Sequence, residues 1–519
     1  MAETGGVVRG RREDTPRRAA FWKVTGTLVA KVVGFLGDMV VASLFGMNYI
    51  VDVTLLAEDA VTTVIGFVTA PISIPLVPEL TAARQKGQED ERTLLSSVLA
   101  LFSLAGAVML TVGIAWPRVF VLLFASGFTG TTEAYAEVAF RWMAPIALFM
   151  VVTTTVKTAL AVRKDFAIMS FSDAVMNLAI IVGLLLGARK DALPAVKTAA
   201  YMCATLLVWV TFWVRGGWAL LPSLRHVDAR VGRLIRQAGP LFIGSATDVL
   251  LTLIDRRMAS HLAAGSIASI DYASKIYLLP LGIWALQIAE AAYPYLVQAL
   301  VEGDVRRMND LARTSLHRIL FFLLPAFAGI LLLGEPVIRL LFQRGAFTAV
   351  DTERVGTVLQ GYSGLMLFTG VQYIQTRLFY TRRNTTTPML VGVVALGANV
   401  GLNYLLGFVW GLGAFGLAVA SSIAAFISVT ALYLIYRRMY AKVGWGLLLP
   451  AVVRMGVATA AMSAGIWLLQ EHIHVLLLIV LAVVLYMGVA LALRDEEARG
   501  YARLVLSLPA RLRKAKPEA

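Results

Sequence analysis

Long apolar runs recur along this chain of 519 residues, with short polar stretches between them. A run of roughly 20 apolar residues is long enough to cross the hydrocarbon layer of a bilayer as a helix. The pattern predicts about fourteen such helices between Phe21 and Leu493. Their ranges are 21–46, 51–78, 94–115, 137–161, 168–187, 195–220, 236–262, 268–299, 314–334, 355–381, 386–408, 412–436, 447–469 and 475–493. Because backbone polar groups in lipid must be bonded within each segment, we expect an all-α polytopic membrane protein.

The composition agrees with this environment. Hydrophobic residues make up 58% of the chain and charged residues 15%, whereas a soluble domain usually has nearer a quarter charged. The mean hydropathy is +0.75. No soluble domain of useful size is evident, which argues against a membrane enzyme with a catalytic extramembrane domain. The net charge is +15, but a nucleic-acid-binding protein would carry its basic face on such a domain, so nucleic acid is not the expected partner.

The cations follow the predicted crossings. Arg and Lys crowd the amino terminus, alternate loops and the carboxyl-terminal tail, while the intervening loops carry few. This is the positive-inside pattern, so we expect a multi-pass protein of a bacterial cytoplasmic (inner) membrane with both termini in the cytoplasm.

Two parts of the chain resemble each other at an offset of about 217 positions. Asp38, Ala42 and Ser43 recur in spacing as Asp255, Ala259 and Ser260, and Pro78, Leu123-Phe124 and Gly127 recur as Pro294, Leu341-Phe342 and Gly345. Since an even number of predicted crossings separates the copies, they should share one orientation, related by a pseudo-two-fold axis along the membrane normal. The repeat thus predicts two lobes of six helices, plus two carboxyl-terminal helices.

The predicted organisation has six parts. They are a basic cytoplasmic amino terminus (1–20), an N-lobe (21–220), a cytoplasmic linker (221–235), a C-lobe (236–437), two further helices (438–493) and a basic cytoplasmic tail (494–519).

Ionisable residues inside apolar segments indicate where a functional site lies, because each costs a few kcal/mol in lipid unless it faces a cavity or a partner. Both predicted lobes concentrate them in their first two helices. They include Lys31, Asp38, Asp52, Glu58, Asp59, Asp255, Arg256, Asp271 and Lys275. Local pairing, such as Asp255 with Arg256, would explain single residues, but the cluster as a whole predicts a polar cavity.

One motif carries a family resemblance. The segment Leu341-Phe342-Gln343-Arg344-Gly345-Ala346-Phe347-Thr348 resembles the signature that opens helix 10 of the MurJ (MviN) lipid II flippases, in the multidrug/oligosaccharidyl-lipid/polysaccharide exporter superfamily. Further similar segments are Gly34-Phe35 with Asp38, Ala259-Ser260-His261-Leu262, Gly265-Ser266, Leu279-Pro280-Leu281-Gly282, residues 380–388 and Gly416-Leu417-Ala418. The resemblance extends over the whole chain.

The resemblance implies a transporter, not an enzyme, that moves undecaprenyl-pyrophosphate-linked peptidoglycan precursor (lipid II) to the outer leaflet by alternating access. On this basis Lys31, Arg256 and Lys275 would engage the pyrophosphate, and Asp52 and Ser269 the headgroup. The cation set departs from the family pattern: Lys31 stands where an arginine is expected, Gly37 replaces a second, an apolar residue near Ile65 replaces a third, and Ser274-Lys275 replaces an Asp-Arg pair. Lysine neutralises phosphate but lacks the planar bidentate fork of arginine.

These departures leave other substrates open. A polyprenyl-linked oligosaccharide for exopolysaccharide or O-antigen is one alternative, and a cation-coupled multidrug exporter that uses the acids Asp38, Asp52, Glu58 and Asp59 is another.

Energy coupling is a separate question. Asn399 and Asn403 are four positions apart and share one helix face. By resemblance, these two with Asp255 and Ser421 would form a sodium site, and oxygen ligands suit such a hard cation. Asparagine also joins membrane helices through hydrogen bonds, and H+ or the membrane potential are alternatives to Na+. We expect no resident cofactor, while binding of cell-wall synthesis proteins stays open.

Overall fold

The structure is a computed structural model that describes residues 16–163, 165–187, 190–216, 218–223, 228–440 and 445–503. It divides into two compact units, a first unit of residues 1–265 and a second unit of residues 266–519. Most of the predicted amino terminus (1–20), part of the predicted linker (221–235) and most of the predicted tail (494–519) lie outside the described residues.

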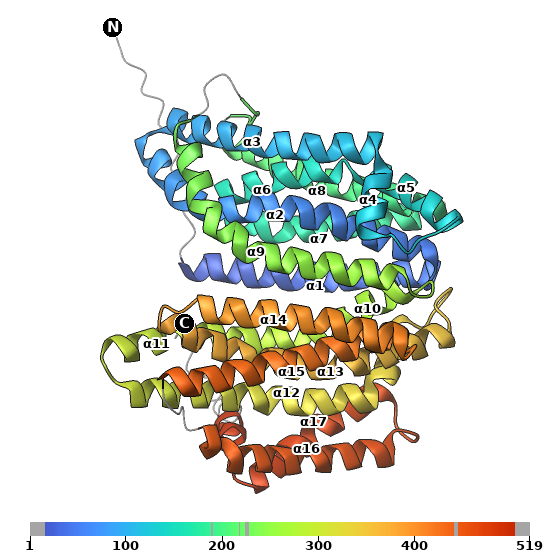
Figure 1. Cartoon of the computed structure of the whole chain (residues 1–519), viewed down its shortest axis with the longest axis vertical. Coiled ribbons are helices and arrows are strands. Elements are labelled where there is room, and N and C mark those ends of the chain that lie inside the picture. Colours follow the sequence, from blue (N-terminus) through green and yellow to red (C-terminus); the bar gives the residue numbers. More distant parts are fainter. Residues whose placement is uncertain are drawn as a thin grey trace, which may run out of the picture. The chain divides into compact units, whose positions relative to one another are not determined.

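The first unit consists of helices in its described part. They are α1 (Pro16–Phe45), α2 (Tyr49–Lys86), α3 (Gln88–Ala115), α4 (Pro117–Phe124), α5 (Thr131–Met143), α6 (Ile146–Val162), α7 (Phe166–Leu185), η1 (Lys190–Ala192), α8 (Leu193–Gly216) and α9 (Arg230–Ser260). Helix α2 packs against α3, α5, α6 and α9, and α1 packs against α7. Figure 1 shows these helices running side by side.

The second unit is also helical wherever it is described. Its elements are α10 (Ser266–Pro280), η2 (Leu281–Ala285), α11 (Leu286–Val301), α12 (Val305–Phe342), α13 (Ala349–Thr381), α14 (Thr386–Leu402), η3 (Asn403–Val409), α15 (Gly413–Tyr440), η4 (Trp445–Leu448), α16 (Leu449–Leu469) and α17 (Val475–Ala492). Helix α13 packs against α10, α11, α12 and α15, while α16 packs against α17 and α12.

Local sequence signals explain where several helices begin. The Asn48 side chain accepts hydrogen bonds from the first backbone N–H groups of α2. Thr348 and Asp351 form a reciprocal capping box at the start of α13, so two N–H groups that have no partner within the helix are bonded. The Thr348 cap is part of the helix-10 signature, so that motif has a structural role.

The two π-helical segments interrupt α-helical runs of the second unit. Segment η2 directly follows Pro280, and η3 begins at Asn403. Such segments are rare and frequently lie at functional sites. Here they adjoin two places where the sequence predicts function: the helix that carries Lys275 and the helix that carries Asn399.

The predicted fold class is confirmed, and each predicted apolar segment coincides with helix. Within the described residues, 11 helices are long and apolar enough to cross a membrane, and Phe171–Leu185 is a shorter apolar helix. Helix α13 does not meet these criteria. In α13, Gln360, Gln372, Gln375 and Arg377 interrupt the apolar sequence.

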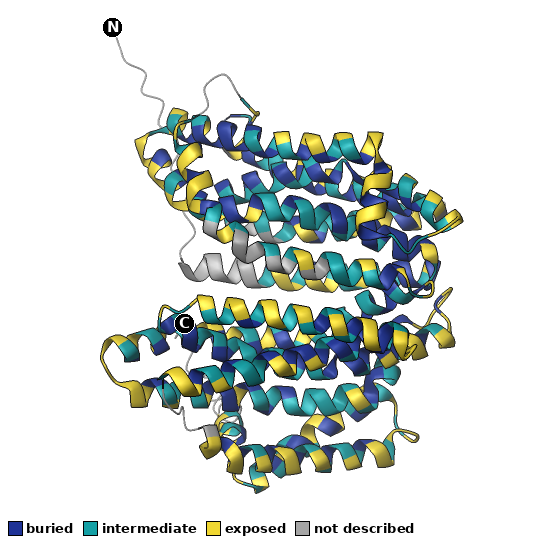
Figure 2. Cartoon of the chain, in the orientation of Figure 1, coloured by how far each residue is buried: buried dark blue, intermediate teal, exposed yellow. Residues whose placement is uncertain are grey.

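Apolar side chains also cover the outside of the helices. Figure 2 shows exposed positions recurring along the helices of both units. On α16 and α17, for example, Val457, Trp467 and Leu477 are exposed. Large exposed apolar side chains on helices of this length are typical of contact with lipid.

The order of elements in each unit agrees with the sequence repeat. Phe124 and Phe342 each end a helix, and after residues 125–130 and 343–348 the next helices begin at Thr131 and Ala349. Helix α9, which we predicted to open the C-lobe, packs against α2 inside the first unit. The lobe boundaries and the symmetry axis stay predictions.

Candidate substrate-binding residues

Arg256 of α9 is one of the three cations predicted to engage pyrophosphate. Its guanidinium forms an ion pair with the Asp59 carboxylate of α2, and 16% of the Arg256 side chain and 34% of the Asp59 side chain are exposed. An opposite charge on a neighbouring helix is the usual compensation for an ionisable residue among apolar segments. The pair therefore connects α9 to α2, and part of each side chain stays exposed.

Asp52, which we predicted to contact the headgroup, binds the protein backbone in this conformation. Its side chain is 3% exposed, and its Oδ2 accepts a hydrogen bond of 2.6 Å from the backbone N–H of Gly265. Gly265 has a φ of +88°, a conformation that glycine adopts readily. In this conformation the Asp52 carboxylate anchors the chain just after α9.

Lys31 lies on α1 and is exposed. Among the described residues, none forms a hydrogen bond or ion pair with its side chain. Its ammonium group is thus available to an anion.

Lys275 of α10 is held by its own helix. Its Nζ lies 2.7 Å from Oδ2 of Asp271, one turn earlier, and 5.5 Å from the ring centre of Tyr272. About a third of the side chain, 30%, stays exposed. Ser269, in contrast, is 2% exposed, and its hydroxyl donates to the Ser266 carbonyl of the preceding turn at 2.8 Å.

Three of the four predicted sodium ligands lie together in the second unit. The Asn399 side-chain amide donates to the Ser421 hydroxyl at 3.2 Å, and the Asn403 amide donates to Asn399 Oδ1 at 3.0 Å. Asn403 is fully buried, and Asn399 nearly so. The fourth, Asp255, lies on α9 in the first unit. Among the described residues no cluster of three or more His, Cys, Asp or Glu side chains could hold a metal ion.

A buried ion pair that sequence reasoning missed lies between α2 and α8. The Lys197 ammonium contacts Glu58 Oε2, with 10% and 17% of the two side chains exposed. The Tyr201 hydroxyl donates to Glu58 Oε1 at 3.1 Å. Lysine inside the apolar run 195–220 was the available signal, but its partner could only be found once α2 and α8 were placed side by side.

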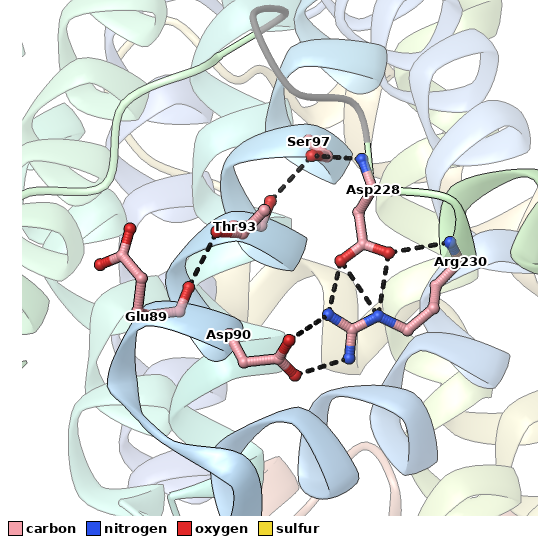
Figure 3. Close-up of polar contacts among 6 residues, drawn as sticks. All are labelled: Glu89, Asp90, Thr93, Ser97, Asp228 and Arg230. Atoms are coloured by element: carbon pink, nitrogen blue, oxygen red, sulfur yellow. Dashed lines mark hydrogen bonds and ion pairs between the residues drawn. The ribbon is translucent and has the colours of Figure 1, made fainter.

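The segment that precedes α9 is bound to the start of α3, as Figure 3 shows. Arg230 donates through Nη1 and Nη2 to the Asp90 carboxylate at 2.8 and 3.1 Å, and through Nε to Asp228 at 2.9 Å. The Asp228 backbone N–H donates to the Ser97 hydroxyl at 3.1 Å. Hydrogen bonds from Arg230 hold the pKa of the Asp228 carboxyl below its ordinary value. This arrangement, which we call the α3 clasp (Asp90, Ser97, Asp228 and Arg230), attaches the amino end of α9 to the first unit.

Comparison with known proteins identifies the family. The family described as "Lipid II flippase MurJ" matches residues 41–487 of the chain. The chain belongs to the MurJ family of lipid II flippases. Proteins of this family are transporters, which agrees with the prediction of a transporter and not an enzyme.

Individual relatives support the MurJ assignment. A probable lipid II flippase MurJ of Vibrio cholerae is 26% identical over 424 residues, which is 78% of this chain and 80% of the relative. That of Thermotoga maritima is 24% identical over 480 residues, 91% of this chain and 95% of the relative.

Solved structures show the same fold. A lipid II flippase MurJ in an inward closed conformation has a TM-score of 0.77 at 21% identity, covering 93% of this chain and 100% of the other. An inward-facing multidrug transporter of the MATE family in the MOP superfamily has a TM-score of 0.65 at 15% identity, covering 81% and 97%. Both comparisons agree with the predicted all-α membrane fold.

This MurJ-family chain also has an apolar pocket within its second unit. The pocket has a volume of about 630 Å³ and lies among α10, η2, α12, α16 and α17. Its lining includes Ile276, Trp284, Phe322, Met462 and Tyr486, and the Trp284 and Phe322 rings are stacked with centres 4.0 Å apart. Ile276 directly follows Lys275, so helix α10 presents a cation and an apolar wall at adjacent positions.

Proposed function

We propose that this chain moves lipid II from the inner to the outer leaflet of the bacterial cytoplasmic membrane by alternating access. The observation that carries the proposal is the family match, which spans residues 41–487. Lipid II joins a pyrophosphate-linked saccharide to a long prenyl chain, so a binding site must accept both an anion and an apolar tail.

The second unit contains surfaces of both kinds on one helix. Lys275 supplies a partly exposed cation, and Ile276 and Leu279 line the apolar pocket. Successive helical positions point about 100° apart, so the headgroup and the tail would approach different faces of α10. We assign the apolar pocket to part of the prenyl tail.

The cations compensate the pyrophosphate charge while it crosses a region of low dielectric constant. We assign Lys31, Arg256 and Lys275 to this task. Arg256 and Lys275 each have a carboxylate close by, Asp59 and Asp271 respectively. When the substrate phosphate binds, it would exchange with these carboxylates, so the cations remain compensated before and after transport.

The proposed contacts of Asp52 and Ser269 with the headgroup require a second conformation, since both side chains are buried in this one. Alternating access provides such a conformation, because it exposes different surfaces at each membrane face. The sodium site at Asp255, Asn399, Asn403 and Ser421 is proposed on the same basis. The linked amides of Asn399 and Asn403 support it, and coupling to H+ is the alternative.

Growth rescue tests the substrate. Cells depleted of their own lipid II flippase should grow when they express this chain, whereas Lys31→Gln and Lys275→Gln variants should reach the membrane in normal amounts without supporting growth. If both variants rescued fully, the assignment of the cations would be refuted. If the chain restored only exopolysaccharide or O-antigen output, the alternative substrate would replace lipid II.

We also propose that both termini face the cytoplasm, as the positive-inside pattern indicates. In a Cys203→Ala background, Ala502→Cys should react with a membrane-impermeant maleimide only after the cells are opened. Labelling in intact cells would reverse the orientation.

A further inference from the structure

Arg377 lies on α13, four positions before the helix ends at Thr381. The central carbon of its guanidinium lies 5.5 Å from the ring centre of Tyr293, on α11, and 5.9 Å from that of Tyr380. No ion pair or hydrogen bond connects it to a carboxylate in the described part of the chain, and its buried Nε has no hydrogen-bond partner. Among the described residues, the guanidinium thus contacts aromatic rings and no carboxylate.

The aromatic contacts leave the buried Nε of Arg377 without an acceptor among the described residues. A ring face attracts the positive charge of a guanidinium, while the N–H groups lie in the plane of the group and still need acceptors. A charged group with unbonded donors in a membrane protein is costly, which is why such residues generally mark a substrate path.

Arg382, five positions later, is an arginine whose contacts include a hydrogen bond from its Nε to a neighbouring side chain, and it serves as a comparison. Its guanidinium lies 4.6 Å from the ring centre of Tyr440, and its Nε donates to the Tyr436 hydroxyl at 3.0 Å. Both arginines thus rest against tyrosines. Only Arg382 has its Nε bonded, so the two side chains form a matched pair.

The planar shape of the Arg377 guanidinium indicates which kind of acceptor it would bind. The planar fork of arginine matches the oxygens of a phosphate and binds them bidentately. Of the three cations that we assign to the pyrophosphate, Lys31 and Lys275 lack the fork, and the guanidinium of Arg256 is paired with Asp59. Arg377 supplies a guanidinium on another helix.

We propose that Arg377 is a phosphate-binding residue that engages the pyrophosphate of the lipid substrate at the cytoplasmic end of the second unit. This inference rests on the proposed function and on the predicted orientation, which puts the basic Arg382-Arg383 turn in the cytoplasm. The guanidinium, braced by Tyr293 and Tyr380, receives the phosphate first, and Lys275 on α10 binds it later in the cycle.

The test compares the two arginines. Purified protein in phosphatidylcholine nanodiscs is titrated with undecaprenyl pyrophosphate, undecaprenol or phosphatidylglycerol, for the wild type and the variants Arg377→Lys, Arg377→Gln and Arg382→Lys. We expect the wild type to prefer the pyrophosphate over undecaprenol. Arg377→Lys should weaken pyrophosphate binding about tenfold, since a bond to a charged group is lost, and Arg377→Gln should weaken it further. Arg382→Lys should bind as the wild type does.

Each other outcome has a distinct meaning. If the wild type binds pyrophosphate and the Arg377 variants bind equally well, the inference is wrong and the proposed function stands. If the variants lose only phosphatidylglycerol, the phosphate belongs to a bilayer lipid, and the assignment to the substrate is wrong. If the wild type does not distinguish pyrophosphate from undecaprenol, the proposed function itself fails. Equal thermal melting of all variants shows that binding, and not folding, has changed.

Discussion

Breaking the Lys197–Glu58 pair should destabilise the first unit strongly. Lys197→Met removes the ammonium group but keeps most of the aliphatic volume, and it leaves the Glu58 carboxylate buried between α2 and α8 with 17% of its side chain exposed. Removing one partner of a buried ion pair typically costs about 3–5 kcal/mol. Because the Tyr201 hydroxyl still donates to Glu58 at 3.1 Å, we expect the lower end, about 3 kcal/mol.

A double-mutant cycle separates this charge effect from lost packing. Glu58→Gln alone leaves the ammonium buried and should also destabilise, whereas Glu58→Gln combined with Lys197→Met removes both charges and should recover most of the loss. The free energy of unfolding is measured for all variants in the same detergent by denaturant titration. Lys197→Arg, which keeps the positive charge, is the matched control.

The reasoning would be refuted by a Lys197→Met variant that unfolds within about 1 kcal/mol of the wild type, the range of exposed ion pairs. An additive double mutant would also contradict it, because additivity means that the two side chains do not interact.

Three further results are expected. Gly127→Ala should lower stability by about 2 kcal/mol, because a Cβ there would lie 2.5 Å from the backbone of Ser260; unchanged thermal melting would contradict this contact. Thr348→Ala removes the cap of α13 and should cost about 1 kcal/mol, and the same assay checks it. Because the folded-state pKa of Asp228 is lowered, its pairing with Arg230 stabilises the protein above the ordinary pKa of about 3.9 and is lost as the pH falls through the lowered value. Asp228→Asn should therefore melt lower at pH 7 and lose less stability on acidification than the wild type does.

The helical segments were predictable because a membrane imposes a strong pattern on sequence. Even the interruptions had local signals: the predicted helix 268–299 contains Pro280, where the π-helical segment η2 follows, and the predicted helix 137–161 contains Pro145, where α5 and α6 meet. The sequence contained no comparable local signal for which helices pack against each other. Helix α9 was predicted to open the C-lobe, but whether it packs with α2 depends on contacts between distant parts of the chain.

The candidate site was predictable in residue type but not in side-chain direction. Asp52, Asp59 and Lys197 are all charged residues in apolar segments, and the sequence alone does not distinguish them. Their surroundings differ: Asp52 bonds a backbone N–H, Asp59 pairs with Arg256, and Lys197 is buried against Glu58. Which face of a helix a charge occupies, and which neighbour compensates it, is decided by tertiary packing.

Helix α10, with Lys275 beside the wall of an apolar pocket, has a practical consequence for purification. A surfactant with an anionic head and an alkyl chain resembles the proposed lipid substrate in both its charge and its apolar tail. It should therefore compete with that substrate for binding at this helix. Uncharged maltoside or glucoside surfactants present no such head. The choice of solubilising agent would therefore alter apparent ligand affinity even where the protein stays folded.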